Sequence, residues 1–519
     1  LNIAKDELKR TSLARYEILH QAEELLMSTG TIIPLYNYGD PYLLKPNLTG
    51  MYTMNLGYKF MDQIHDPNNP SLKDFTVSVG TKAETFDPGS NSDVSTCLAM
   101  NQFLIGAKRY SNREHIQEEG EREGIYRATL DDGVCDVSKK LVVDERVPDT
   151  DPDHVDIEKC PDLMDGIAHG ETKEDYIGTA RYTIKLKGSD TSTDIDDAVW
   201  NDGSKITADD FIYSWARSSS GVYNGQGFGM WCEMFDAIRG YEAWNTIGQQ
   251  KTNNISEWDE DDQKAWNKLS SAQQNQYMQA FNGVGSYPAR GCAGGMAGVM
   301  KDNDYQFTVQ LINDCDYFDQ LLCFPAFFPV PTHKMGIKWE GTGEVEGCAS
   351  AENSNWWTSK DTYPTTGAFK FKEMNNTEAG QIVIEKNDKA RPSFIEGMKT
   401  TEITFKLLDA DSTMYDFYKS NTLQMIDSVS SGIIDQVKQT EDWKVAEQMG
   451  LYYASFNVND NTFDTNAATD EATRQTYRRI MNLLINRYDI TEHVVKSGAT
   501  PANGMVSTGI IERCIPEDT

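Results

Sequence analysis

The sequence predicts a mixed α/β protein with more than one domain. Its 519 residues exceed what a single hydrophobic core commonly serves. Residues 182–187 alternate between apolar and polar side chains, which is the period of a half-buried strand. Residues 201–203 (Asn-Asp-Gly) have the composition of a turn, and Thr207 then stands three residues before Asp210, as in a capping box. A strand, a turn and a capped helix in succession indicate the mixed class.

The beginning of the chain predicts a helix followed by an extended segment. Residues 1–29 place four apolar side chains on one stripe among charged residues, and Gly30 follows where the helix should end; the four are Tyr16, Leu19, Ala22 and Leu26. Residues 31–46 are apolar and aromatic but contain three prolines. Because proline has no amide proton to donate, we expect an edge strand or an extended segment here.

Strands and helices are expected to alternate along the rest of the chain. The expected strands are residues 75–79, 306–311, 403–408 and 451–457, together with a hairpin of 367–372 and 382–387. The apolar run 321–331 could be a buried strand with prolines at its ends. Residues 231–283 are typical of helices, with Trp266, Leu269, Tyr277 and Phe281 facing inward. A clean helical stripe recurs from Tyr477 to Tyr488, and Asp489 with Glu492 is expected to cap the next helix.

The charge balance excludes two classes of partner. The chain has 48 Lys and Arg against 80 Asp and Glu, which gives a net charge of −32. Nucleic acids and anionic membrane surfaces need clustered cationic side chains, so we expect neither as a partner. The sequence has no run of about 18 apolar residues, so we expect no membrane-spanning helix. Residues 1–15 also lack the apolar stretch of a signal peptide, although a mature chain would look the same.

The nine cysteines include no CxxC pair, so a zinc site of the usual spacing is not expected. Most stand in surroundings typical of loops, and cysteines in loops outside the cell usually pair. Closing a loop of about 25 residues stabilises a fold by roughly 3 kcal/mol on the chain-entropy model. The pairs that bracket such loops are Cys135 with Cys160, then Cys292 with Cys315 and Cys323 with Cys348.

The acidic run from Asp149 to Glu158 resembles a calcium loop only in part. Its aspartates stand at alternate positions, but His154 and Cys160 occupy the places where an EF-hand needs Gly and Glu. Runs of like charge are usually solvated. We therefore expect a solvated acidic loop.

Residues 200–211, WNDGSKITADDF, form the most specific motif of the chain. The motif resembles the signature W-[ST]-D-G-x-x-[VIL]-T-A-x-D-[FV] of family 5 extracellular solute-binding proteins, which include the oligopeptide- and dipeptide-binding proteins of ABC transporters. Asn201 takes the place of Ser or Thr. The resemblance implies an α/β, periplasmic-binding-protein-like clamshell of the class with an extra lobe, with mixed sheets and three lobes.

The order of the family-like segments resembles a circular permutation. Residues 31–50 resemble the C-terminal end of the family, whereas residues 84–88, ETFDP, resemble the E-x-[LF]-D-P near its beginning. Residues 66–73, rich in Pro and Asn, would link the two ends. Such an order is possible because the termini of compact domains often lie close together. Beyond residue 504 the family continues into the centre of its third lobe, with the aspartate that anchors a peptide's α-amino group and the basic residues that meet its carboxylate, so that lobe is expected to be incomplete here.

The resemblance also implies a division into lobes. Lobe I would comprise residues 39–104 and 331–450. Lobe II would comprise residues 105–330. The incomplete lobe III would comprise residues 1–38 and 451–519.

The function that the resemblance implies is capture of oligopeptides between two lobes and delivery to the permease of an ABC importer. Such a receptor works outside the cytoplasm as a monomer without a cofactor, and touches the membrane only through a lipid anchor that this chain does not contain. An extended peptide can add main-chain hydrogen bonds to strand edges while its side chains occupy wet pockets.

Several positions match contacts of the family. Ser92 and Val94 would lie on the first crossing strand, Tyr453 in the strand that connects the lobes and Tyr38 in the proline-rich segment. Phe228 or Trp231 would replace a pocket tyrosine. Each aromatic residue taken alone is equally well explained as a core or surface side chain.

Two other functions stay open at this point. A receptor of the same fold could bind nickel, haem or a sugar, because a fold does not fix a function. A hydrolase with paired carboxylates is the second alternative, but 80 Asp and Glu make such pairs inevitable. The sequence has no HExxH, GxSxG, P-loop or GxGxxG motif, so we expect no enzyme.

Overall fold

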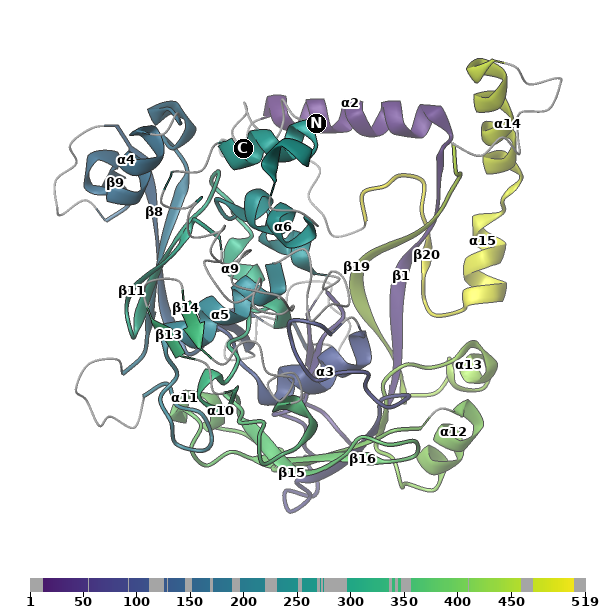
Figure 1. Ribbon diagram of the computed structural model, residues 1–519. Coiled ribbons are helices and arrows are strands. Elements are labelled where there is room, and N and C mark those ends of the chain that lie inside the picture. Colours follow the sequence, from purple (N-terminus) through teal and green to yellow (C-terminus); the bar gives the residue numbers. More distant parts are fainter. Residues whose placement is uncertain are drawn as a thin grey trace.

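The computed structural model confirms the mixed α/β class (Figure 1). The structure describes residues 13–54, 56–91, 93–111, 126–127, 129–144, 152–168, 171–188, 197–219, 231–250, 254–267, 271, 274, 296–335, 338–340, 344–346, 356–408, 410–458 and 470–507. None of the helices in these ranges is long and apolar enough to cross a membrane.

The larger sheet has eight strands and mixed directions. Its order is β15 (Phe369–Asn375), β16 (Gln381–Lys386), β17 (Glu402–Lys406), β4 (Asp74–Ser78), β18 (Met425–Ile426), β1 (Ile32–Leu44) and β19 (Trp443–Ser455), and β20 (Thr500–Pro501) also pairs with β1. Strand β4 runs parallel to both of its neighbours. The predicted hairpin is the antiparallel pair β15 and β16. Strands β4 and β16, far apart in the sequence, therefore share one sheet.

The second sheet has five strands and contains the alternating strand. Its order is β11 (Val299–Asn303), β12 (Gln306–Gln310), β10 (Ala180–Leu186), β8 (Cys135–Val143) and β9 (His154–Asp156). The apolar side chains of β10 are at most 1% exposed, as the alternation predicts; they are Tyr182, Ile184 and Leu186. Helix α5 (Ala208–Ser219) follows after the predicted turn, in which Gly203 has a φ of +95°. Only glycine adopts this backbone conformation without strain.

Smaller elements complete the fold. The short strands are β2 (Tyr52–Thr53), β3 (Lys59–Phe60), β5 (Lys108–Ser111), β6 (Tyr126–Arg127), β7 (Thr129–Asp132), β13 (Lys338–Glu340) and β14 (Glu344–Glu346). The helices are α2 (Leu13–Thr29), α3 (Val94–Phe103), α4 (Pro161–Ala168), α6 (Tyr241–Gln249), α7 (Glu260–Asn267), α9 (Phe318–Leu321), α10 (Thr332–Met335), α11 (Pro392–Ile395), α12 (Asp411–Lys419), α13 (Ser431–Val437), α14 (Glu471–Leu484) and α15 (Arg487–Asp489). Of the inward residues expected in 231–283, Trp266 is buried, and Leu269, Tyr277 and Phe281 lie outside the described residues.

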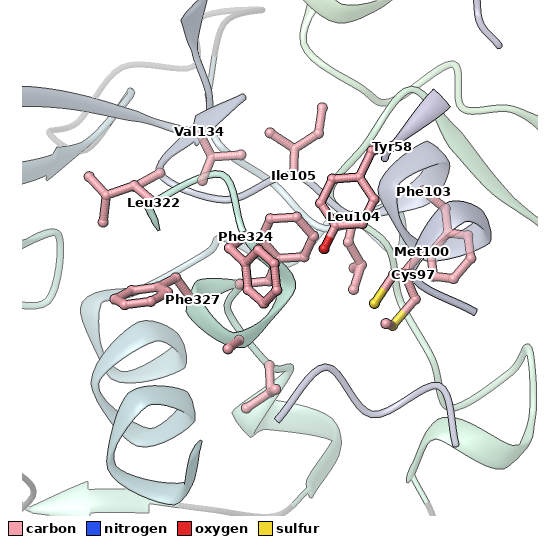
Figure 2. Close-up of a cluster of buried hydrophobic side chains, with 14 of the residues drawn as sticks. Tyr58, Cys97, Met100, Phe103, Leu104, Ile105, Val134, Leu322, Phe324 and Phe327 are labelled. Atoms are coloured by element: carbon pink, nitrogen blue, oxygen red, sulfur yellow. The ribbon is translucent and has the colours of Figure 1, made fainter. Parts of the chain in front are cut away.

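One hydrophobic core joins the bodies built on the two sheets. Figure 2 shows part of it, where side chains of α3 (Met100, Phe103) lie near those of residues 104–105 and of residues 322–327. The run 321–331 is buried as expected but forms no strand: α9 ends at Leu321 and residues 325–327 form a 3-10 turn. Prolines cannot donate to a ladder, so the run packs as a buried connection between the bodies. We call residues 104–107 and 322–331 the two crossings.

Strand β1 corrects the expectation of an edge strand. It lies inside the sheet, with β19 on one side and β18 and β20 on the other. Pro34 itself pairs only with Tyr453 of β19, and a bulge separates it from Tyr36. Only two residues of this strand, Pro34 and Pro41, lack an amide donor, so the rest of the strand can occupy a central place in the sheet.

The link between β1 and β4, residues 45–73, is held by a segment far away in the sequence. The amides of Lys399 and Thr400 donate to the carbonyl of Asp62, and the amide of Thr401 donates to the carbonyl of Lys73 2.8 Å away. Residues 399–401 thus hold the predicted linker 66–73 at its last residue, Lys73, and hold the chain at Asp62, four residues before the linker begins. The family-like order of segments fits within one body, while the division into three lobes stays a prediction.

Helix α14 packs with its polar face inward. Its one buried residue is Arg478, whose Nε donates to the carbonyl of Thr29 at the end of α2. The predicted stripe is a helix as expected, but it faces outward, since Ile480 and Met481 are almost half exposed and Leu484 is 78% exposed. The next helix, α15, is capped by Asn486, whose side chain accepts from the amide of Asp489. Asp489 stands at the N-cap of the π-helix Ile490–Val495 that follows, but its side chain makes no capping hydrogen bond.

The expected disulfide between Cys135 and Cys160 is wrong, because both residues are buried free thiols. Cys135 begins β8, whereas Cys160 follows β9, which pairs with the other end of β8 at Val143. Eight strand steps place the two cysteines about 25 Å apart, far beyond the Cα separation that a disulfide spans. The other two expected pairs each include a cysteine outside the described residues, Cys292 and Cys348.

Peptide mapping tests this correction. Iodoacetamide added to denatured, unreduced protein is expected to alkylate both Cys135 and Cys160. In the folded protein both should resist, because burial raises the pKa of each thiol and removes it from solvent. A disulfide-linked peptide containing both residues would contradict the structure.

The acidic loop is only partly solvated. Asp153 is exposed, but Asp156 is 2% exposed, and its carboxylate accepts from the amide of Glu158 3.0 Å away. Asp156 therefore caps the 3-10 turn Ile157–Lys159 rather than facing water. Asp149 and Asp151 lie outside the described residues.

Candidate functional site

The first part of the candidate site is the long ribbon of β1 and β19. The two strands pair from Ile32 with Ser455 to Leu43 with Trp443, with two bulges near Pro34 and Asn37. In the described part of the chain β19 is the last strand of the sheet order; a β-bridge joins its Gln448 to Leu56, and the Ser507 hydroxyl donates to its Gly450 carbonyl. An unpaired strand edge offers main-chain donors and acceptors to another extended chain.

Tyrosines cover one region of this ribbon. The rings of Tyr36 and Tyr452 are stacked with centroids 5.1 Å apart, and Tyr38 meets both rings edge-on at 5.7 and 6.2 Å. Tyr38 is 38% exposed, whereas Tyr452 and Tyr453 are almost half exposed. We call Tyr36, Tyr38 and Tyr452 the tyrosine cluster; Tyr453, the next residue of β19, lies on the opposite face of the strand. It presents aromatic surface with polar hydroxyl groups beside a strand edge, which suits side chains of varied chemistry.

The phenols of Tyr36 and Tyr38 stay protonated at neutral pH. Burial raises the pKa of Tyr36, and the neighbouring Tyr38 and Tyr452 raise it further. Burial also raises the pKa of Tyr38, with a contribution from Tyr452. Each neutral hydroxyl can both donate and accept a hydrogen bond.

The second part of the candidate site is the loop 85–93, which precedes α3. Asp87 accepts from the amide of Gly89 3.0 Å away, and the Asn91 side chain donates to the carbonyl of Thr85. A Cβ atom at position 89 would lie 2.6 Å from the Ser218 hydroxyl, so only glycine fits this approach to α5. The loop is therefore fixed by its own side chains and by α5.

A buried ion pair joins this loop to α5. Arg217 donates to Asp87 at 2.6 Å, and their side chains are 6% and 1% exposed. The pair links the body of the larger sheet, which contains the loop, to the body of the smaller sheet, which contains α5. Because both charges are out of water, loss of either partner leaves a costly unpaired charge.

Trp231 holds the same loop from another side. Its indole Nε1 donates to the carbonyl of Asn91 at 2.8 Å, and its ring lies 5.1 Å from that of Phe324 in the second crossing. The half-buried Trp231 therefore positions the loop against the crossing. Trp231 therefore lies beside the candidate site, but its indole N–H is already bonded to the protein backbone.

In the motif 200–211, one buried carboxylate, that of Asp210, accepts most of the hydrogen bonds that hold the segment in place. Asp210 accepts from Trp200 Nε1 at 3.3 Å, and from the amide and hydroxyl of Thr332 at 3.0 and 2.5 Å. It also accepts from the amide of Thr207, which confirms half of the predicted capping box. The motif thus fastens α5 to the residue that follows the second crossing, a structural role.

Residues near this motif resemble a catalytic triad in composition only. The same nitrogen of His333, Nε2, lies 3.0 Å from both the Ser204 hydroxyl and the Asp202 carboxylate. A triad needs the carboxylate on Nδ1, so that Nε2 is free to take the serine proton. Within the described parts of the chain, no group of three or more His, Cys, Asp or Glu is placed to hold a metal ion.

The structure brings together only part of the predicted site. Tyr38 and Tyr453 both lie on the ribbon. Val94 is the first residue of α3 rather than part of a crossing strand, because Asp93 caps the helix by accepting from the amides of Ser95 and Thr96. Ser92 and Phe228 lie outside the described residues.

Three residues with clear roles were absent from the prediction, Tyr36, Tyr452 and Arg217. Tyr36 and Tyr38 are two residues apart in an extended segment, so they share a face, and this signal was available in the sequence. The pairing of Tyr36 with Tyr452, and of Arg217 with Asp87, joins distant segments and had no local signal.

The family model for the middle part of bacterial extracellular solute-binding proteins, family 5, matches residues 182–512, more than half of the chain. The chain belongs to this family. Membership confirms the resemblance drawn from residues 200–211 and the expected fold class. Proteins of family 5 are substrate-binding proteins of the extracytoplasmic space.

Two curated relatives show how much of a family 5 protein is matched. The dipeptide-binding protein DppE of Bacillus subtilis is 22% identical over 62% of this chain and 45% of its own length. A dipeptide-binding protein of Lactococcus lactis is 22% identical over 69% of this chain and 55% of its own length. The chain thus spans about half the length of these relatives.

Among solved structures, a periplasmic oligopeptide-binding protein of Borrelia burgdorferi, OppAIV, is 18% identical with a TM-score of 0.47, over 82% of this chain and 59% of that one.

Proposed function

We propose that this family 5 chain is the receptor of an ABC importer and captures oligopeptides outside the cytoplasm. The observation that carries the proposal is the open edge of β19 beside the exposed tyrosine cluster. A peptide in extended form can extend the sheet at that edge, and its side chains can contact the tyrosine rings. The receptor would work as a monomer and without catalysis.

The contacts of the loop 85–93 couple it to a closing movement of the two bodies. The loop 85–93 is fastened to α5 by the Arg217 and Asp87 pair and to the second crossing by Trp231. Movement of the two bodies about the crossings would therefore carry this loop toward or away from a bound peptide. Clamshell closure of this kind is a common form of domain motion.

The charged ends of a peptide need compensation wherever they are buried, because an unpaired buried charge costs several kcal/mol. Asp93, the last residue of the loop 85–93, already caps α3 with both carboxylate oxygens. We therefore expect the 519-residue chain to bind free tripeptides weakly. Peptides whose two termini are neutral should bind without the free-energy cost of burying an unpaired charge.

Isothermal titration with two tripeptide pools tests these statements. We expect a pool with acetylated and amidated ends to bind at least as tightly as a pool with free ends. Tighter binding of the free pool by tenfold or more would show that another group of the chain compensates the charges. A chain that binds neither pool would contradict the proposed function, and cleavage of the peptides, checked in parallel, would favour a hydrolase.

A tyrosine variant tests the place of binding. We expect Tyr452→Ala to weaken binding of the capped pool by about tenfold, because it removes an aromatic contact of roughly 1–1.5 kcal/mol. Tyr477→Ala is the matched control, since Tyr477 is similarly exposed, at 41%, but lies on α14. Equal effects of the two substitutions would exclude the tyrosine cluster as the binding surface.

A further inference from the structure

A buried ion triad lies at the base of the ribbon of β1 and β19. The ammonium of Lys59 in β3 donates to the Asp40 carboxylate at 2.5 Å and to the Asp427 carboxylate at 2.7 Å. The lysine side chain is 2% exposed, and the two aspartate side chains are 18% and 11% exposed. Asp40 belongs to β1 and Asp427 follows β18, so one lysine ties β3 to two paired strands of the larger sheet. We call these three residues the Lys59 triad.

Lys59 is also held through its main chain. Its carbonyl accepts from the side-chain amide of Gln102 at 2.8 Å, and the oxygen of the same side chain accepts from the amide of Met61 at 3.0 Å. Gln102 belongs to α3, the helix that follows the loop 85–93. The Lys59 triad therefore connects β1 to the helix that supports the second part of the candidate site.

Asp40 marks the position at which the ribbon leaves the core. Tyr42 and Leu43 lie on one side of it in β1 and are at most 3% exposed, whereas Tyr38 of the tyrosine cluster lies on the other side and is 38% exposed. The Lys59 triad thus clamps the ribbon at the base of its exposed part. An opening of this base that separates Asp40 from Lys59 would bring the aspartate into water.

The triad contains two carboxylates but one ammonium. One positive and two negative charges give a net charge of −1, and this excess charge lies where little water reaches it. Two carboxylates that share a buried site do not both ionise without cost, so one of them binds a proton more readily than an aspartate in water does. Burial raises the pKa of Asp40; Lys59 lowers this pKa and Asp427 raises it, and the net direction is upward.

The other elements around Asp40 complete the electrostatic surroundings of the triad. Tyr42, on the same strand, is a phenol whose own pKa is raised by burial, so it stays neutral. On β19, the residue opposite Asp40 is Ala446. The nearest charged residues of that strand are Lys444, opposite Tyr42, and Glu447, one position beyond Ala446. Burial and the other members of the triad are what shift the pKa of Asp40.

We propose that the Lys59 triad binds one proton at Asp40 and thereby acts as a clamp that acid tightens at the base of the ribbon. With Asp40 protonated the triad is neutral: Lys59 keeps its ion pair with Asp427 and a hydrogen bond to the carbonyl oxygen of Asp40. When the base opens, Asp40 is in water and releases the proton until the pH approaches about 4. The closed form therefore binds the proton more tightly than the open form, and acid favours closure.

The clamp has a defined pH window. A carboxyl group whose pKa is higher in the closed form contributes stability that is fully present below about pH 4, the ordinary value of an aspartate. This contribution is lost as the pH rises through the raised pKa. Lowering the pH from neutral would therefore restrict the movement of the tyrosine cluster, whose Tyr38 stands two residues before Asp40.

Hydrogen exchange of the full chain, without peptide, tests the proposal. After correction for the intrinsic pH dependence of exchange, we expect protection of the amides of residues 40–43 to increase as the pH is lowered from about 7.5 to about 5, by at most about tenfold per pH unit for one proton. Asp40→Asn is neutral at every pH and keeps an oxygen for Lys59, so it should abolish this dependence. Asp416→Asn is the matched control, because Asp416 is 70% exposed and pairs with Lys419 on α12, and it should retain the dependence.

Carbon-13 NMR of the side-chain carboxyl groups supplies a second measurement that does not depend on any variant. In the wild-type chain the Asp40 carboxyl should titrate above the ordinary aspartate value of about 4. Asp427→Asn leaves one carboxylate for one ammonium, so it should shift this midpoint downward. Titration of Asp40 at or below the ordinary value, or an unchanged pH dependence of protection in Asp40→Asn, would overturn the proposal. Neither measurement involves a peptide, so both outcomes are independent of the proposed receptor function.

Discussion

Replacing Arg217 by leucine is expected to lower the free energy of unfolding by about 3–5 kcal/mol, because it leaves the Asp87 carboxylate buried without its cationic partner. Asp87 is 1% exposed, so water cannot take over the role of the guanidinium. Chemical denaturation followed by tryptophan fluorescence measures the loss. Amide exchange in the loop 85–93 should rise at the same time, since Asp87 also holds Gly89.

A double variant serves as the control for this prediction. Arg217→Leu combined with Asp87→Leu removes both charges, so it should be more stable than Arg217→Leu alone. A double variant that loses as much as the sum of the two single variants would show that the pair makes no mutual contribution. In that case the cost of Arg217→Leu would arise from packing alone.

Asp210→Ala is expected to cost about 3–5 kcal/mol. The substitution removes the acceptor of hydrogen bonds from Trp200, Thr207 and Thr332, and each buried donor left without an acceptor costs about 1–3 kcal/mol. Because Thr332 follows the second crossing, the variant should also loosen the connection between the two bodies. Thermal and urea denaturation, with hydrogen exchange at Thr332, measure both effects.

Asp209→Ala is the matched control for this second prediction. Asp209 is the next residue in the same helical turn, but it is partly exposed and pairs with Lys301, itself 24% exposed, at 2.9 Å. A partly exposed pair contributes about 1 kcal/mol or less. If Asp209→Ala and Asp210→Ala destabilise equally, the arrangement of hydrogen bonds around Asp210 is not what stabilises α5.

Local patterns in the sequence predicted those elements whose partners are nearby. Strand β10 could be predicted because one of its faces meets a single core, so its side chains alternate strictly. The hairpin of β15 and β16 is likewise a local pairing. The position of β1 could not be predicted, because a central place in the sheet depends on β18 and β19, almost 400 residues away.

The site was predicted less well for a related reason. A motif can be specific and still have a structural role. In residues 200–211 the Asp210 carboxylate accepts hydrogen bonds from Trp200 and Thr332 within the protein. A helical stripe likewise indicates a face but not what covers that face, and in α14 the buried side chain is Arg478. Tyr452 and Arg217 acquire their roles from contacts with distant segments, which no local pattern encodes.

The position of β1 also has a consequence for synthesis. Strand β1 ends at Leu44, but its neighbour β19 is complete only at Ser455. At about 5–20 residues per second, the ribosome needs roughly 20–80 s to make the intervening chain of about 400 residues. During that time the aromatic, β-prone segment 32–44 has no sheet to join, so the nascent chain should depend on a chaperone that binds such segments. Ribosome profiling of chaperone-bound nascent chains would show this as early recruitment that ends after residue 455 emerges.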